Sequence, residues 1–182
     1  MTKDILLSVH EEADGEVLKK LADCLKANDA FARQLRDFAH GLEAEQRVQG
    51  ITWQPHPGQI LICHFGLGFR PPEMIKTRPV IVISPKSRLW TRLCIVVPIS
   101  SRPPNPPLYH HYKLPNGLLP GLKYEEAWVK GDTVAAVSCE RLDRIKIGPR
   151  QYVSPQVPPD VLKEVRRCIL HSTGMQSLTQ HW

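Results

Sequence analysis

The chain has 182 residues, 42% of them hydrophobic, and a formal net charge of +6. This size and composition suffice for one packed domain plus an appendage and exclude wholesale disorder. No apolar run approaches the ~20 residues that a bilayer-spanning helix needs, and the long apolar segment of a signal peptide is missing. We therefore expect a cytoplasmic protein with no membrane partner.

The charge is distributed unevenly along the chain. Residues 1–50 carry 7 Lys/Arg and 10 Asp/Glu, a net charge of −3, whereas residues 51–182 carry 17 Lys/Arg and 8 Asp/Glu, a net charge of +9. A basic domain behind an acidic appendage favours a polyanionic partner for the basic part. The charge by itself is equally compatible with a role in solubility alone.

The acidic appendage, residues 1–50, is predicted to form a helical hairpin. Two apolar stripes recur at helical spacing, within residues 16–27 and 31–42, on either side of a break at Asn28 and Asp29. A hairpin this small cannot hold a large core alone, so we expect it to pack on the rest of the chain or on a second subunit. Oligomerisation, inhibition of the basic domain and docking remain open as its role.

After a Gly/Pro-containing linker at residues 49–57, the sequence becomes typical of strands. Short β-branched runs bounded by Gly, Pro and Ser predict strands at residues 58–65, 78–84 and 93–99, with weaker candidates at 109–114, 127–130, 133–138 and 144–147. The proline-rich residues 102–107 predict an exposed loop, because proline has no backbone N–H to donate to a sheet. A final helix is predicted over residues 158–171.

Six or seven short strands with one covering helix predict a mainly β, α+β fold, either a small barrel or two packed sheets. The expected organisation is an appendage at residues 1–50, a barrel domain at 55–171 and a tail at 172–182. The cysteines have no metal-ligand spacing, so we expect free, buried thiols and no metal site; they are Cys24, Cys63, Cys94, Cys139 and Cys168.

Three segments of the basic domain carry a family resemblance. Residues 57–62 (PGQILI) are similar to an opening G-D-[IL]-V strand, residues 73–84 (EMIKTRPVIVIS) to the signature E-x-x-x-x-R-P-x-[LIV]-V-[LIV]-S, and residues 96–101 (VVPISS) to a strand ending in P-[ILC]-[TS]-[TS]. Over roughly residues 55–171 the chain thus resembles the MazF/PemK family of toxin endoribonucleases. It departs from the family at Gln59, where Asp is usual, and at Ser100, where Thr is frequent.

The resemblance implies an SH3-like barrel of the CcdB/PemK type with a C-terminal helix. It also implies metal-independent cleavage of single-stranded RNA, in which the ribose 2′-OH attacks the adjacent phosphorus and the 5′-oxygen leaves. Such a reaction needs in-line positioning, charge stabilisation and proton transfers, and it needs no protein nucleophile. A homodimer, a cognate antitoxin as partner and the absence of any cofactor are further implications.

The resemblance assigns catalytic roles to Arg78, Ser100 and Glu73. The guanidinium of Arg78 is always charged and can bind two phosphate oxygens, while Pro79 holds Arg78 in an extended conformation. Ser100 would donate a hydrogen bond to a phosphate oxygen, and Glu73 would orient Arg78 or contact RNA. The alternatives are a solvated arginine beside a strand, a turn serine and a surface carboxylate.

Further residues are predicted to contact RNA. Basic side chains surround Arg78 in the sequence, together with the aromatic Phe69 and Trp90, a combination typical of grooves for single-stranded nucleic acid. The RNA-binding candidates are Lys76, Arg70, Lys86, Arg88, Ser101 and Asp132. Asp132 resembles the family's turn near the end of the barrel and would help to shape the RNA groove, although a turn-forming role is the simpler explanation.

Histidine is the usual general acid or base near neutral pH, which makes His64, His110 and His111 further candidates. Strand alternation predicts that His110 and His111 point to opposite faces, and exposed loop histidines are the simpler interpretation.

Two functions of other classes remain open. One is a non-enzymatic toxin of the CcdB type that binds DNA gyrase, since fold does not settle function. The other is a catalytically silent module that binds RNA or DNA and acts in regulation.

Overall fold

The computed structural model describes residues 50–66, 73–87, 89, 91–122 and 125–181, together with residues 19, 20 and 23. The chain divides into two units, residues 1–43 and 44–182. Lys19, Lys20 and Asp23 are helical, as predicted. The rest of the predicted helical hairpin lies outside the described residues, and so do Phe69, Arg70, Arg88 and Trp90.

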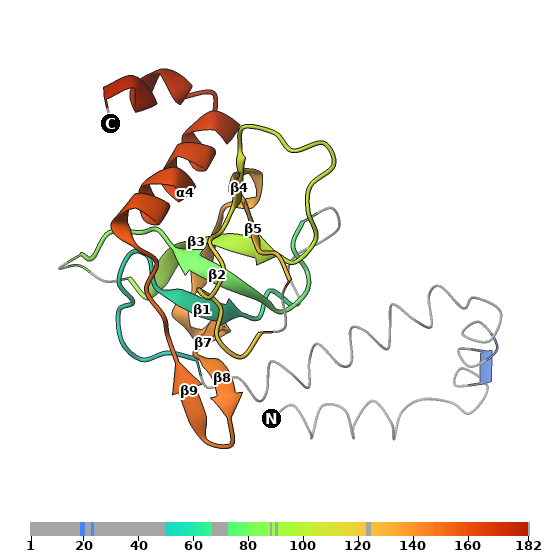
Figure 1. Ribbon diagram of the computed structural model, residues 1–182. Coiled ribbons are helices and arrows are strands. Elements are labelled where there is room, and N and C mark those ends of the chain that lie inside the picture. Colours follow the sequence, from blue (N-terminus) through green and yellow to red (C-terminus); the bar gives the residue numbers. More distant parts are fainter. Residues whose placement is uncertain are drawn as a thin grey trace. The chain divides into compact units, whose positions relative to one another are not determined.

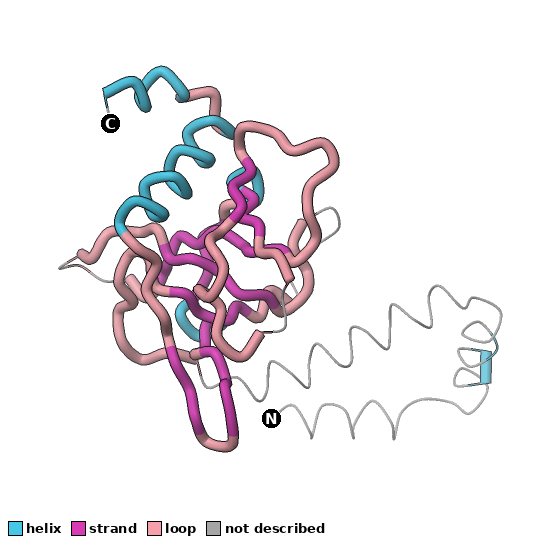
Figure 2. The backbone as a smooth tube through the Cα atoms, viewed as in Figure 1, coloured by secondary structure: helices cyan, strands magenta, loops and turns pink. Residues whose placement is uncertain are grey.

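The second unit is built around a mostly antiparallel seven-stranded sheet (Figures 1 and 2). Its strands are β1 (Ile60–Cys63), β2 (Arg78–Val82), β3 (Leu93–Ser100), β4 (His111–Lys113), β5 (Trp128–Lys130), β6 (Ala135–Ser138) and β7 (Leu142–Asp143). The order is β4-β5-β3-β2-β1-β7, with β6 also paired to β3. β6 pairs with the beginning of β3 and β5 with its end, so these two strands follow one another along β3, with the 3₁₀ helix η1 (Gly131–Thr133) between them.

The sheet is open, and the predicted closed SH3-like barrel is wrong in this respect. Within the described ranges no pairing joins β4 to β7, the two ends of the strand order. Closure needs tilted strands long enough to pair along both edges. β4 has three residues and β7 has two, so neither offers a ladder that could close the sheet.

The other β-structure predictions are confirmed. All seven predicted strand segments contain a strand, and residues 102–107 form none. The short strand β7 and a strand at Gln151–Val153 (β9) were not predicted. β9 pairs with β8 (Ile145–Gly148) in a two-stranded hairpin that projects from the sheet in Figure 1.

One helix covers one face of the sheet. α4 (Pro159–Ser172) begins with proline at its first position, where no N–H is required, and it buries Val161, Val165 and Cys168. A short 3₁₀ helix, η3 (Gln176–His181), follows it in the stretch predicted as a tail. None of the helices in the described ranges is long and apolar enough to cross a membrane.

Two hydrophobic clusters lie on the two faces of the sheet, as strand alternation requires. The α4 face packs Ile81, Val97 and Ile99 against Val161 and Val165 of the helix. The opposite face contains Val80, Val82, Cys94 and Val96, and it is closed by Phe65, Ile51 and Leu142. Alternate residues of β2 and β3 thus belong to different clusters. A polar residue at the end of either strand therefore lies on the same face as the cluster residue two positions away.

The cysteine prediction is confirmed for the cysteines that the structure describes. Cys63, Cys94, Cys139 and Cys168 are free and buried. The Cys94 and Cys139 sulfur atoms lie 3.2 Å apart. Burial raises the pKa of Cys63 and of Cys94 to about 12, so both thiols stay protonated near neutral pH and serve as small apolar side chains.

Candidate functional site

Arg78 begins β2, at the edge of the cluster on the face away from α4. It pairs with Cys63 of β1 and is two residues from the buried Val80, so its side chain shares the face of that cluster. Arg78 is half-buried, and its buried Nε atom has no hydrogen-bond partner in the part of the chain that the structure describes. A buried N–H donor of a charged group without an acceptor is costly and calls for an explanation, of which a role in binding or catalysis is one.

Arg78 and Ser100 lie on neighbouring strands, each two residues beyond the last pair of β2 and β3. That last pair is Val80 with Pro98, so strand alternation gives Arg78 and Ser100 the same face of the sheet. Ser100 in turn pairs with Trp128, and Trp128 pairs with Lys113. Directly opposite residues of an antiparallel sheet share one face, with Cβ atoms about 4.5–5.5 Å apart. We call Cys63, Arg78, Ser100, Trp128 and Lys113 the cross-strand row.

The two ends of the cross-strand row differ in exposure. Cys63 is fully buried and Lys113 is exposed; between them Arg78 and Trp128 are half-buried, and Ser100 is 5% exposed. Cys63 thus marks the closed end of the row and Lys113 its open end.

The Ser100 hydroxyl takes part in a local turn. Its oxygen accepts a hydrogen bond from the Arg102 N–H at 3.1 Å and donates one to the Arg102 carbonyl at 3.3 Å. The turn interpretation of Ser100 is thus realised. The two roles are compatible, because the Arg102 N–H fixes the oxygen while the hydroxyl proton, at a long donor–acceptor distance, can rotate toward a substrate oxygen.

The other described candidates lie outside the cross-strand row. Glu73 and Lys76 are exposed in the segment before β2, and Ser101 is exposed just after β3 ends. Lys86 is exposed, with its Nζ 3.4 Å from the Nε2 of His56. Asp132 belongs to a separate group with two histidines.

His64 follows β1 in the chain, and its ring contacts Thr77, the residue that precedes Arg78. Its Nδ1 lies 3.1 Å from Thr77 Oγ1, and its backbone N–H donates to the Arg141 carbonyl at 2.8 Å. Burial lowers the pKa of His64, against the smaller opposing effect of the Asp143 carboxylate. The ring is thus neutral at physiological pH and helps to position the start of β2.

The lowered pKa of His64 predicts acid sensitivity. Between its folded pKa and the ordinary value of 6.5, the unfolded chain binds a proton that the folded chain does not, so stability falls as the pH drops below about 6.5. We expect His64→Asn to lose less stability than the wild type between about pH 7.5 and pH 5.5, because the substitution removes this proton uptake. Urea unfolding at both pH values measures it; equal losses in the two proteins would contradict the prediction.

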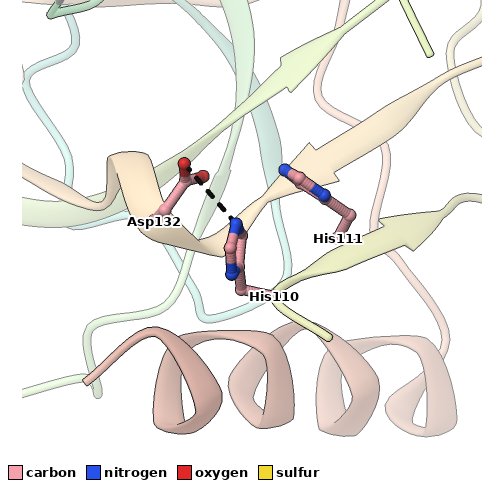
Figure 3. A group of neighbouring side chains, drawn as sticks. All are labelled: His110, His111 and Asp132. Carbon is pink, nitrogen blue, oxygen red and sulfur yellow. Dashed lines mark ion pairs between the residues drawn. The ribbon is translucent and has the colours of Figure 1, made fainter. Parts of the chain in front are cut away.

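His110, His111 and Asp132 form a second polar group (Figure 3). His110 Nε2 lies 3.7 Å from Asp132 Oδ2, and the two imidazole rings are in edge contact with centroids 4.3 Å apart. The prediction that the two histidines point to opposite faces is therefore wrong. β4 begins only at His111, so His110 lies in a turn and strand alternation does not apply to the pair.

This group offers a metal ion fewer ligands than its composition suggests. One ligand atom from each residue lies within 4.8 Å of the others. However, the Leu108 N–H donates to His111 Nδ1 at 3.0 Å, so in the neutral ring the proton lies on Nε2. A metal ion bound to His111 Nδ1 would break this hydrogen bond. A metal ion bound to His111 Nε2 would require the ring proton to lie on Nδ1, where it would face the Leu108 N–H. His110 and Asp132 alone are ready ligands, too few for a site of three protein ligands.

A cleft of about 510 Å³ lies between the segment leading into β4 and the helix α4. It is lined by Pro107, Leu108, Tyr109, His111, Tyr112, Glu164, Arg167, Cys168 and His171. No member of the Arg78–Ser100 pair lines it. The chemistry that the family signature predicts is thus centred at a strand end, away from this hollow.

Sequence reasoning missed three residues at the open end of the row. Trp128 and Lys113 belong to the row itself, and Glu126 accepts a hydrogen bond from Trp128 Nε1 at 3.0 Å. Only the pairing of β3, β4 and β5 brings them to Ser100. In the sequence, the only signal was that Trp128 is an aromatic residue in a predicted strand, and this does not show that Trp128 lies beside Ser100.

The comparisons with known proteins agree with this architecture. Residues 56–173 match the family described as PemK-like, MazF-like toxin of type II toxin-antitoxin system. The chain is 30% identical to the Escherichia coli (strain K12) protein YifN over 148 residues, 70% of this chain and 97% of YifN. It is 28% identical to an uncharacterized protein of Haemophilus influenzae (strain Rd) over 138 residues, 69% of this chain and 94% of that protein.

Among solved structures, MazF (Form-I) from Deinococcus radiodurans is similar, with 25% identity and a TM-score of 0.52 over 68% of this chain and 99% of that chain. Over the matched part, the fold of this chain is therefore similar to that of a solved MazF structure. The chain belongs to the family of PemK-like, MazF-like toxins of type II toxin-antitoxin systems.

Proposed function

We propose that this chain is an endoribonuclease that cleaves single-stranded RNA without a metal ion, as the toxin of a type II toxin-antitoxin system. The observation that carries the proposal is the buried Nε of Arg78, which has no hydrogen-bond partner among the described residues. Arg78 shares a sheet face with the Ser100 hydroxyl of the neighbouring strand. An unpartnered guanidinium donor beside a hydroxyl is suited to a phosphate group. Family membership supports the choice of RNA as the phosphate-bearing substrate.

In this mechanism the substrate's own 2′-OH is the nucleophile. Arg78 stabilises the negative charge that develops on the phosphorane oxygens, and Ser100 donates a hydrogen bond to one of them. Glu73, exposed five residues before Arg78, is the proposed partner that orients the arginine or the RNA. The 2′-OH passes its proton to solvent as the new O–P bond forms, and the P–O5′ bond breaks. The 5′-oxygen leaves as a hydroxyl with a proton taken from solvent, and the product carries a 2′,3′-cyclic phosphate.

The proposed RNA-binding surface contains the basic residues Lys76 and Lys86, both exposed, together with Ser101. Arg70 and Arg88 are proposed for the same surface on their sequence positions. Asp132 is left out of it, because its carboxylate pairs with His110. We further propose a homodimer and a cognate antitoxin whose acidic segment is attracted by the net charge of +9 on residues 51–182.

The purified wild-type chain, incubated with single-stranded RNA in EDTA, is expected to cleave it and leave 2′,3′-cyclic phosphate ends. A matched RNA with 2′-deoxy sugars at the cleavage positions should stay intact, because the attacking hydroxyl is missing. Cleavage of the deoxy substrate, or loss of activity in EDTA, would refute the mechanism. Failure to cleave RNAs of varied sequence would instead favour one of the two alternatives.

Those alternatives give different results in two binding assays. A CcdB-type toxin would bind DNA gyrase and inhibit supercoiling without cutting RNA. A silent regulatory module would bind nucleic acid without cutting it, and the Ser100 and Gln59 departures are compatible with that outcome.

A further inference from the structure

We propose that the indole of Trp128 is the stacking platform for an RNA base adjacent to the cleaved phosphate, held in place by Glu126 and Lys113. This inference rests on the proposed function, because it places a nucleotide beside the Arg78–Ser100 pair. It adds a positioning residue that the family signature does not contain.

The position of Trp128 is the first argument. It pairs directly with Ser100, so its side chain extends from the same face, about 5 Å away at Cβ. It also lies between the nearly buried Ser100 and the exposed Lys113, at the open end of the cross-strand row. A strand of RNA with its phosphate at Arg78 and Ser100 therefore has a base within reach of the indole.

The fixed orientation of the indole is the second argument. Its Nε1–H donates to Glu126 Oε2 at 3.0 Å, and Lys113 Nζ lies 6.0 Å from the ring centroid. Lys113 and Glu126 also form an ion pair, so each of the three side chains contacts the other two and its orientation is restricted. Ordering these side chains before the ligand arrives reduces the entropy cost of binding.

The charge of the group favours stacking over phosphate attraction. The Lys113–Glu126 pair contributes no net charge, and its two side chains are 49% and 38% exposed. Lys113 and the Trp128 N–H lower the pKa of Glu126, so the carboxylate stays ionised and offsets the lysine. What the group offers to a nucleotide is an aromatic surface, which accepts any base because every base has a π-face.

A purely structural tryptophan is the competing explanation, since Trp128 is half-buried and pairs with Ser100 in the sheet. The two explanations differ in one measurable respect. A stacking residue is coupled to one particular base of the RNA, whereas a structural residue affects all positions of the RNA equally.

The test measures binding of a fluorescent 2′-O-methyl RNA, which cannot be cleaved, to the full-length chain by anisotropy. Abasic nucleotides are placed at each position in turn. Trp128→Ala is expected to raise the Kd for intact RNA roughly tenfold, within the range for one base–aromatic stack. For wild type, one abasic position should raise the Kd by a similar factor, and at that position Trp128→Ala should have no further effect.

Two other variants separate stacking from loss of fold. Trp128→Phe keeps an aromatic ring without the Nε1–H bond and should recover most of the affinity. Trp53→Ala removes a partly exposed tryptophan outside the cross-strand row and should bind like the wild type. Thermal unfolding of all variants checks that the fold is intact.

If wild type cleaves and binds RNA while Trp128→Ala keeps the wild-type Kd and the wild-type abasic profile, the Trp128 proposal is wrong and the proposed function stands. If Trp128→Ala weakens binding equally at every abasic position, its role is structural and the proposal is also wrong. If wild type neither binds nor cleaves RNA, both proposals fail together.

Discussion

Arg78→Ala is expected to reduce RNA cleavage by at least about 10²–10³-fold, the loss typical of removing one donor that stabilises charge in a transition state. The physical reason is that Arg78 shares a sheet face with Ser100, and the only other cation of the cross-strand row, Lys113, lacks the paired donors of a guanidinium. Single-turnover cleavage of single-stranded RNA, with enzyme in excess, measures the chemical step directly.

The same substitution, Arg78→Ala, should not lower the stability of the folded chain. Among the described residues the buried Nε of Arg78 has no hydrogen-bond partner, so removing the guanidinium removes an unmet desolvation cost. We therefore expect Arg78→Ala to keep the Tm of the wild type or raise it. An Arg78→Ala variant that is inactive yet fully folded would show that Arg78 is needed for ligand binding or catalysis and not for folding.

Two variants sharpen this experiment. Arg78→Lys keeps the charge but not the two-pronged geometry, so it should retain only a minor part of the activity. Arg167→Ala removes a partly exposed guanidinium from α4, on the other face of the sheet, and should leave cleavage unchanged. Wild-type cleavage by Arg78→Ala would exclude Arg78 from the reaction and with it the proposed site.

Gly131→Ala is expected to destabilise the second unit by about 1–3 kcal/mol, the range for overpacking a close contact. A Cβ on Gly131 would lie 2.7 Å from the carbonyl carbon of Cys168 and 2.9 Å from its Cβ, so the backbone of α4 would have to move. Gly131 also accepts a hydrogen bond from Ser172 Oγ at 3.0 Å and donates its N–H to the His110 carbonyl at 2.8 Å.

Urea unfolding monitored by circular dichroism measures this loss, with Gly148→Ala as the matched control. The Cβ of that control would meet only the Gln151 side-chain amide at 3.1 Å, which can rotate away. Equal stability of Gly131→Ala and wild type would show that α4 is free to shift from η1, contrary to the close packing described above.

Local patterns accounted for most of the elements. The Val/Ile runs at residues 78–84 and 93–99 predicted β2 and β3 because β-branched residues fit a pleated, buried surface. The Pro158–Pro159–Asp160 start and the apolar spacing after it predicted α4 within one residue at each end. β7 and β9 were missed because strands of two and three residues are too short to show periodicity.

The sheet's closure and the histidine pair show where local rules fail. Whether a sheet closes depends on the lengths of its edge strands. β4 has three of the six residues predicted for it, and β7, which was not predicted, has two. The orientation of His110 depends on the turn before β4, in which the His111 N–H donates to the Leu108 carbonyl at 2.9 Å, and on the pairing of His111 with Lys130, where β4 begins.

The sequence by itself determined the family signature, the strand and helix content of the second unit, and Arg78 and Ser100 as candidates, because each depends on residues close together in the chain. Only the tertiary structure decided which side chains meet at the site. Arg78, Ser100, Trp128 and Lys113 come from four strands, and pairing register alone puts them on one face. A shift of one residue in any of these pairings would turn the side chains to the other face, so register between distant segments sets the composition of the site.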